Sequence, residues 1–122
     1  MNAKLWYVAS PYTKYRHGYE IAYQRALAIT VELLKHKIPV WSPIVYSHQF
    51  VAYGLPIEAK DWMFLDEAMI KACTGCIVYM MEGWEQSSGI IHEVQLFREQ
   101  GKHIEYLPED ALVADIQALA EL

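Results

Sequence analysis

Two acidic residues stand among apolar neighbours, where a carboxyl group can do chemistry. Glu93 lies in SSGIIHEVQLF (87–97), between one and two turns into a predicted helix. The positive end of the helix dipole and partial burial predict an ionised, under-solvated carboxylate, which suits a nucleophile. Asp66 lies in DWMFLDEAMI (61–70), where apolar neighbours raise the pKa of a carboxyl group and suit it to donate a proton.

Each of these residues also has a simpler structural explanation, which spacing alone leaves open. Glu93 is equally compatible with the wet side of its helix, and Asp66 with a surface position beside Glu67. Ser87 or Ser88 is of the type that caps a helix start. If both acids meet in one cleft, they predict chemistry at a sugar carbon, with one acid bonding to the anomeric centre while the other assists the leaving group.

The elements that would position these acids alternate along the chain. Periodicity and turn signals predict strands at 4–10, 38–42, 76–81 and 102–107. They predict helices at 19–36, 57–73, about 87–99 and from Pro108 to the C-terminus. Residues 43–56 are irregular, aromatic and too long for a simple turn, so we expect them to cover something.

Alternating strands and helices predict an α/β fold. We expect one domain, residues 1–122, built as a three-layer sandwich around a mainly parallel sheet of four to five strands, flavodoxin-like or Rossmann-like. Pro39 cannot donate to neighbours on both sides, and KHIEYL (102–107) alternates polar and apolar residues, so both strands should be edges. The predicted strand order is therefore 2-1-3-4.

This order places the binding site beyond the carboxyl ends of the first and third strands. The loops there are SPYTKYRHG (10–18) and EGWEQSSG (82–89), and the second opens a helix whose free amides attract an anion. Aromatic side chains in these loops would stack on a base or a sugar. The candidate substrate-binding residues, including one from the covering segment, are Ser10, Tyr12, Arg16, His48, Trp84, Ser87, Ser88 and Gly89.

Several short motifs resemble the nucleoside 2-deoxyribosyltransferase superfamily, and in particular its compact bacterial and phage branch. They are YVASPY (7–12), SPI (42–44) with His48, DWMFLDEAMIKAC (61–73), GW (83–84), SxGxxxE (87–93) and GK (101–102). The resemblance covers the chain to about residue 107. It implies that Glu93 attacks the deoxyribose C1' and forms a covalent glycosyl enzyme, that Tyr7 orients Glu93, and that Asp66 handles the departing base.

The resemblance also bears on the substrate. Ser87 falls where the related 2'-deoxynucleoside 5'-phosphate N-hydrolases keep a phosphate-binding serine, and Lys14, Arg16 or His17 would supply positive charge. Many members of that superfamily carry an acidic residue just before the third strand, at the position where this chain has Thr74. We therefore expect cleavage of the N-glycosidic bond of a 2'-deoxynucleoside or its 5'-monophosphate, resolved by water or a second base, in a homodimer or higher homo-oligomer.

Two other readings of the function stay open. One is a non-catalytic nucleotide-binding or sensor module. The other is a glycohydrolase of a dinucleotide such as NAD, which would need a longer groove than this chain is expected to build. Incubating the protein with a panel of deoxynucleotides and measuring the release of free base would distinguish these two hypotheses from the first.

Composition and net charge argue against several classes of binding partner. Ten basic and fifteen acidic side chains give a net charge of −5, which argues against duplex nucleic acid. The apolar runs are shorter than the roughly 20 residues that span a bilayer, so we expect a soluble, cytoplasmic protein without membrane contact. Cys73 and Cys76 straddle a helix end and a strand start, which favours structural cysteines. We predict no cofactor and no metal.

Overall fold

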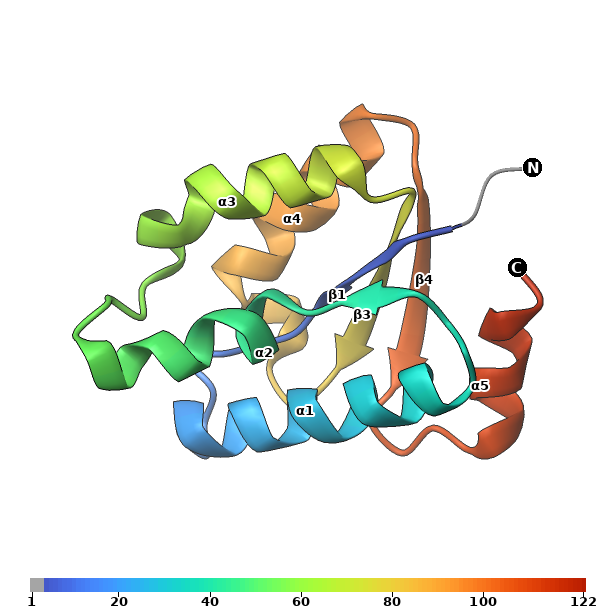
Figure 1. Cartoon of the computed structure of the whole chain (residues 1–122), viewed down its shortest axis with the longest axis horizontal. Coiled ribbons are helices and arrows are strands. Elements are labelled where there is room, and N and C mark those ends of the chain that lie inside the picture. Colours follow the sequence, from blue (N-terminus) through green and yellow to red (C-terminus); the bar gives the residue numbers. More distant parts are fainter. Residues whose placement is uncertain (1–3) are drawn as a thin grey trace.

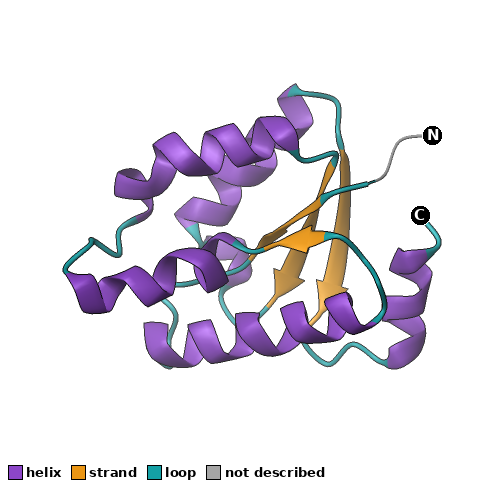
Figure 2. Ribbon diagram, viewed as in Figure 1, coloured by secondary structure: helices purple, strands orange, loops and turns teal. Residues whose placement is uncertain are grey.

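The computed structural model describes residues 4–122 and has a sheet of four parallel strands at its centre (Figure 1, Figure 2). The strands are β1 (Trp6–Ala9), β2 (Val40–Trp41), β3 (Gly75–Met80) and β4 (His103–Pro108). Their order is β2-β1-β3-β4, and every neighbouring pair is parallel. The predicted strand order and both predicted edge strands are confirmed.

Helices cover both faces of the sheet and complete a three-layer α/β fold (Figure 1). The α-helices are α1 (Tyr19–Lys35), α2 (Pro43–Ser47), α3 (Ala59–Ala72), α4 (Ser88–Glu99) and α5 (Val113–Ala120). Two 3₁₀ helices, η1 (His48–Tyr53) and η2 (Trp84–Gln86), lie in the connections. No helix within residues 4–122 combines the length and apolar character needed to cross a membrane.

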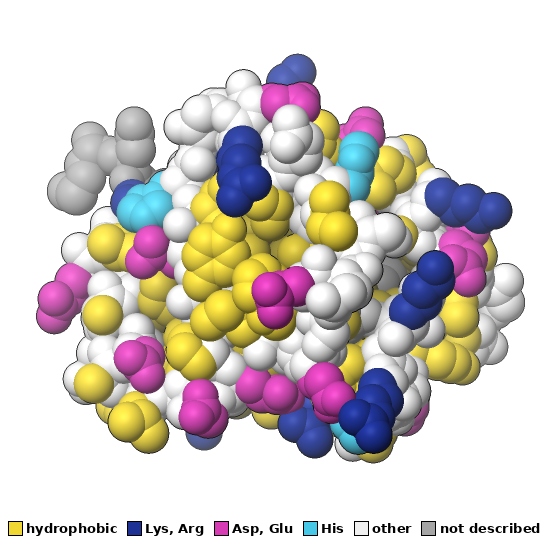
Figure 3. Space-filling model, turned by 180° about the vertical axis from the view of Figure 1, so that it is seen from behind, with side chains coloured by type: hydrophobic (Ala, Val, Ile, Leu, Met, Phe, Trp, Pro, Cys, Tyr) yellow, Lys and Arg dark blue, Asp and Glu magenta, His cyan; other side chains and the backbone are white. Residues whose placement is uncertain are grey.

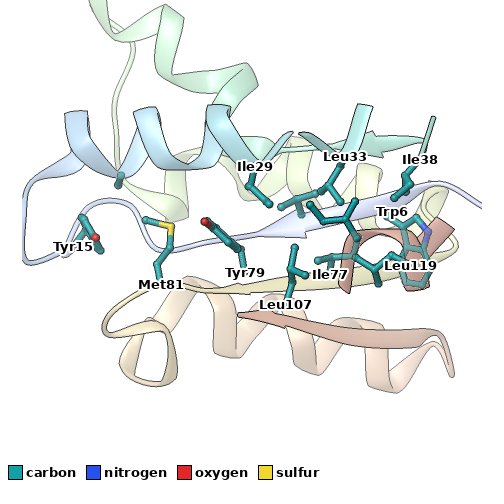
Figure 4. Close-up of a cluster of buried hydrophobic side chains, with 13 residues drawn as sticks. Trp6, Tyr15, Ile29, Leu33, Ile38, Ile77, Tyr79, Met81, Leu107 and Leu119 are labelled. Atoms are coloured by element: carbon teal, nitrogen blue, oxygen red, sulfur yellow. The ribbon is translucent and has the colours of Figure 1, made fainter. Parts of the chain in front are cut away.

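Alternation along the buried strands divides the core into two clusters. Trp6 and Val8 pack with residues of α1 and α5 on one face of the sheet, as Figure 4 shows. Tyr7 and Ala9 point to the opposite face and pack with residues of α3 and α4. Because successive side chains of a strand point to opposite faces, the register of β1 directs Tyr7 toward α4.

The connection expected to be irregular contains two short helices. Ser42 caps α2, because its Oγ accepts a hydrogen bond from the Val45 amide at 3.1 Å, and Pro43 occupies the first helical turn. η1 follows directly and ends at Gly54, whose φ of 85° closes the turn. We refer to residues 43–53, which comprise α2 and η1, as the cover segment.

The last helix starts later than the sequence pattern predicted. Pro108 does not open it but pairs with Met80 as the final residue of β4, an edge strand that tolerates a residue without an amide hydrogen. The helix begins at Val113, after the Leu112 amide donates to Asp115 Oδ2 at 2.8 Å. A side-chain cap, rather than proline, therefore defines this start.

The buried face of α3 also differs from the prediction. In the sequence, helical spacing predicts one apolar face formed by Trp62, Leu65, Met69 and Ala72. In the structure the buried residues of α3 are instead Asp66 and Ile70, and Ala72 is exposed. A hydrophobic pattern counts an aspartate as a solvent-facing position, so it cannot detect a helix face centred on a buried carboxyl group. The face of α3 that turns toward the core is therefore the one that carries Asp66.

Candidate active site

A cavity of about 430 Å³ opens where β1 and β3 end. Its walls come from the loop after β1, the cover segment, the start of α3 and the η2–α4 connection. The volume lies in the range of small-molecule sites, roughly 300 to 1,000 Å³. The predicted residues that line it are Ser10, Tyr12, Asp66, Ser87, Ser88, Gly89 and Glu93.

Glu93 is a buried carboxyl group at the wall of this cavity. Only 7% of the residue is exposed, and its Oε2 accepts a hydrogen bond from the Tyr7 hydroxyl. Tyr7 is fully buried between strand β1 and helix α4 and is not part of the cavity wall. It therefore acts on a ligand only through Glu93.

The protonation of Glu93 differs from the expectation. Burial raises its pKa to about 8, the charge of Asp66 acts in the same direction, and the Tyr7 hydrogen bond opposes them. At pH 7 about a tenth of Glu93 is then ionised. The expected dipole effect is too weak because it falls off within the first turn of a helix, and Glu93 lies beyond the first turn of α4.

Asp66 is the second buried carboxyl group of the cavity. It is 8% exposed, and burial raises its pKa to about 6. This upward shift confirms the sequence expectation for Asp66. Because its pKa remains below that of Glu93, Asp66 is the more ionised of the two at neutral pH.

The SSG sequence opens helix α4 and also lies at the cavity wall. Ser87 caps α4, since its Oγ accepts a hydrogen bond from the Ile90 amide at 3.3 Å. Ser87, Ser88 and Gly89 nevertheless line the cavity, so the first turn of α4 presents its positive end to a ligand. A Cβ at Gly89 would approach nothing closer than 3.9 Å, which leaves this wall open.

Ser10 has a buried hydroxyl group that is available to a ligand. It follows β1, is 6% exposed, and its Oγ is the buried side-chain polar atom that lacks a hydrogen-bond partner among residues 4–122. Buried polar atoms are nearly always paired. Since Ser10 lines the cavity, a polar group of the ligand is the natural partner of this hydroxyl.

Arg16, His48 and Trp84 were predicted to bind substrate, but they do not line the cavity. Arg16 pairs with Glu82 at 2.9 Å, because Glu82 lies two residues after the end of β3, within reach of the first loop. Trp84 packs against Tyr106 of the edge strand, with ring centroids 5.7 Å apart. His48 contacts Tyr12 rather than the cavity.

The first turns of α3 form a cavity wall that was not expected from the sequence. Glu58, Lys60 and Trp62 line the cavity there. Lys14, one of the residues expected to supply positive charge, lines it from the first loop. Within residues 4–122 neither Lys14 nor Lys60 has an ion-pair partner. The available signal was topological, because a helix that leads into a parallel strand starts at the end of the sheet where the other strands finish.

Neither cysteines nor metal-ligand clusters add to this site. Cys73 and Cys76 are buried and unpaired, and burial raises the pKa of Cys73 to about 11, which keeps its thiol protonated. Within the described part of the chain, no group of three or more His, Cys, Asp or Glu side chains is arranged to hold a metal ion.

The chain matches a protein family over most of its length. Residues 4–108, which include every strand and the helices α1 to α4, match the family described as Domain of unknown function (DUF1937). No curated protein matches the chain. The family description carries no activity, so a function has to be argued from the site.

Proposed function

We propose that this chain, which belongs to the DUF1937 family, cleaves the N-glycosidic bond of a 2'-deoxynucleoside or its 5'-monophosphate. The observation that carries the proposal is the buried Glu93 carboxyl group, which accepts a hydrogen bond from Tyr7 and shares the cavity with Asp66. The resemblance of the chain's motifs to nucleoside 2-deoxyribosyltransferases supports the same chemistry.

The reaction begins with a proton transfer between the two carboxyl groups. Of the two carboxyl groups, Glu93 holds the proton more tightly, with a pKa of about 8 against about 6 for Asp66. Moving this proton to Asp66 leaves Glu93 ionised for attack and Asp66 able to protonate the departing base. The difference between the two pKa values makes this transfer cost about 3 kcal/mol, which positive charge developing at C1' offsets.

Bond formation and bond breaking then balance. A Glu93 carboxylate oxygen bonds to C1' while the C1'–N bond breaks, and the bond's electrons pass to the base, which takes the proton from Asp66. Water that gives its proton to Asp66, or a second base, then attacks C1' and releases Glu93. The first outcome is hydrolysis and the second is transfer.

A 5'-phosphate fits the remaining walls. The first turn of α4 offers amides and the Ser87 and Ser88 hydroxyls, while Lys14 and Lys60 provide positive charge from two other walls. Ser10 supplies the unpaired buried hydroxyl. These groups favour the monophosphate over the free nucleoside.

The experiment is to incubate the protein with 2'-deoxynucleosides, their 5'-monophosphates and NAD, and to measure free base by chromatography. We expect base release from a deoxynucleoside monophosphate and a loss of at least about a thousandfold in Glu93→Ala. Glu99→Gln, on the exposed side of the same helix, is the matched control. Adding a second base distinguishes transfer from hydrolysis.

Trapping the intermediate tests the role of Glu93 directly. A 2'-fluoro substrate analogue should leave a sugar adduct on Glu93, identified by mass spectrometry of the digested protein. Nucleotide binding that survives Glu93→Ala, with no turnover in the wild-type protein, would instead identify a nucleotide-binding module. Nicotinamide release from NAD alone would identify a dinucleotide glycohydrolase.

A further inference from the structure

Three side chains form a hydrogen-bonded chain beside the cavity. His48, the first residue of η1, places its Nε2 2.9 Å from Oε2 of Glu20 and its Nδ1 2.7 Å from the hydroxyl oxygen of Tyr12. A carboxylate only accepts hydrogen bonds, so the Nε2 proton faces Glu20. In the neutral ring Nδ1 then accepts the proton of the Tyr12 hydroxyl.

Packing fixes the His48 ring in this arrangement. The ring stacks on Tyr23 of α1, with centroids 4.0 Å apart and planes 14° apart, and its side chain is only 13% exposed. Tyr12 meets the edge of the same ring at 90°, and it also contacts Tyr19. The cover segment, α1 and the first loop therefore converge on His48.

Only Tyr12, of the three hydrogen-bonded residues, lines the cavity. Burial raises the pKa of its hydroxyl to about 12, which keeps the group protonated as the donor to His48. Because the hydroxyl is engaged by His48, which does not line the cavity, the aromatic ring is what Tyr12 offers to a ligand. Its orientation is set by where His48 lies.

A purely stabilising role does not account for the hydrogen bonds that link Glu20, His48 and Tyr12. The Glu20 side chain is 60% exposed, and ion pairs to an exposed partner contribute little to folding. A chain of hydrogen bonds that ends on a cavity-lining ring instead restricts the rotamer of that ring, which is how binding sites are preorganised.

We propose that Glu20 and His48 are positioning residues, which hold the Tyr12 ring at the cavity wall as a stacking surface for the base of the substrate. This inference rests on the proposed function for the identity of the ligand. It predicts a defect in substrate binding, because a mobile Tyr12 ring must be ordered each time the base binds. The chemical step at Glu93 should be unaffected.

The test compares His48→Phe with His48→Gln. Phenylalanine retains a ring against Tyr23 but has no hydrogen-bonding atoms, whereas the glutamine amide offers one acceptor and one donor. We expect His48→Phe to raise KM for the deoxynucleoside monophosphate about tenfold, with kcat within about twofold of wild type, and His48→Gln to recover most of this loss. Glu20→Ala removes the acceptor that faces Nε2 and should also raise KM, whereas the control Glu32→Ala, elsewhere on α1, should leave KM unchanged.

A double-mutant cycle makes the coupling explicit. Tyr12→Phe keeps the ring and removes only its hydroxyl, so it should raise KM about as much as His48→Phe, and the double variant should lose little more. The positioning role would be overturned if the increases in KM of the two single variants were additive in the double variant. It would also be overturned if His48→Gln and His48→Phe had equal effects, or if kcat fell while KM stayed unchanged.

A readout independent of turnover separates this inference from the proposed function. Nitrogen-15 NMR of the imidazole should show the Nε2–H tautomer for His48, and thermal melting should confirm that each variant is folded. If wild-type protein cleaves no member of the panel, the proposed function fails, and the dissociation constant for 2'-deoxyadenosine 5'-monophosphate replaces KM. Failure to bind it, or the Nδ1–H tautomer, overturns the inference.

Discussion

Glu93 and Asp66 line one cavity but differ in how strongly each holds a proton. Burial is the largest cause of both upward pKa shifts, to about 8 for Glu93 and about 6 for Asp66. The proposed chemistry needs the opposite distribution, with Glu93 ionised and Asp66 protonated. The reactive form is therefore a minor form of the singly protonated pair, and this has consequences for both activity and stability.

The pH profile of kcat/KM should be bell-shaped. Below an apparent pKa near 6 both carboxyl groups are protonated and no nucleophile exists; above one near 8 both are ionised and no acid remains. Initial rates from pH 5 to 9 would measure the two limbs. In Asp66→Asn the fall at high pH should disappear, leaving a slower reaction that only rises with pH; a retained bell would contradict the shared-proton pair.

Glu93→Gln should stabilise the protein at high pH. The folded-state pKa of Glu93 lies above its ordinary value of 4.5, so the wild-type protein loses stability as pH rises from 4.5 to about 8. The amide lacks this ionisation, and the advantage of the variant should grow to roughly 3 to 5 kcal/mol above pH 8. Urea unfolding at pH 5 and pH 8.5 measures it.

A surface glutamate of the same helix provides the comparison for this measurement. Glu99→Gln should show no such pH-dependent gain, because Glu99 is exposed at the end of α4. Parallel pH dependence in wild type and Glu93→Gln would show that Glu93 stays ionised when the protein folds.

The environment of a single residue could be predicted where its neighbours along the helix or strand bury it. It could not be predicted where the side chain pairs with a residue far away in the sequence. The Tyr7–Glu93 contact was implied by family resemblance, and the upward pKa shift of Asp66 by its apolar neighbours. Arg16 was placed wrongly, because its pairing with Glu82 joins two loops that lie 66 residues apart in sequence. No local pattern encodes such a pairing.

At the scale of elements, the order of the strands and the buried face of α1 could be predicted from the sequence pattern. The sheet order followed from two edge signals, Pro39 and the alternation of residues 102–107. In α1, Ala22 and Leu33 recur at helical spacing in the sequence, which predicts a shared face, and both are buried. Helix starts set by capping were less predictable, as α5 shows. The face of α3 could not be predicted from hydrophobicity because it is centred on a carboxyl group.

Gly75→Ala should disturb the join between β1 and β3. A Cβ on Gly75 would lie 2.7 Å from Cζ3 of Trp6 and 2.9 Å from the His103 carbonyl oxygen, and neither a buried indole nor a neighbouring strand can easily move. We expect a loss of about 1 to 3 kcal/mol in the free energy of unfolding.

Denaturant unfolding measures this loss, with Gly89→Ala as the control because a Cβ there meets only ordinary contacts. Since Gly75 lies at the start of β3, away from the cavity, ligand affinity of the folded variant should be unchanged. Equal stability of the two variants would mean that β1 and β3 tolerate wider spacing.

At the scale of the whole molecule, the cover segment is joined to both sides of the cavity. His48 contacts Tyr12 on one side, and Phe50 stacks on Trp62 of α3 on the other, with centroids 6.1 Å apart. Both contacted aromatic residues line the cavity. The segment that looked irregular in sequence thus fixes two of the cavity walls, which only the assembled fold reveals.

Apolar side chains also remain on the outside of the molecule. Phe64 of α3 is 76% exposed and Tyr53 of η1 is 83% exposed. Figure 3 shows a group of hydrophobic side chains near the centre of the face seen from behind. Exposed aromatic side chains of this size are typical of protein–protein interfaces.

We expect a homodimer that buries Phe64. In a two-fold dimer each substitution counts twice, and exposing one phenylalanine costs about 1.5 to 3 kcal/mol, so Phe64→Ser should raise the dimer dissociation constant about a hundredfold or more. Sedimentation velocity over a concentration series measures it. Leu112→Ser removes a side chain that is 71% exposed outside α3 and should leave the dimer intact. A monomeric wild-type protein, or equal dissociation constants for wild type and Phe64→Ser, would contradict this interface.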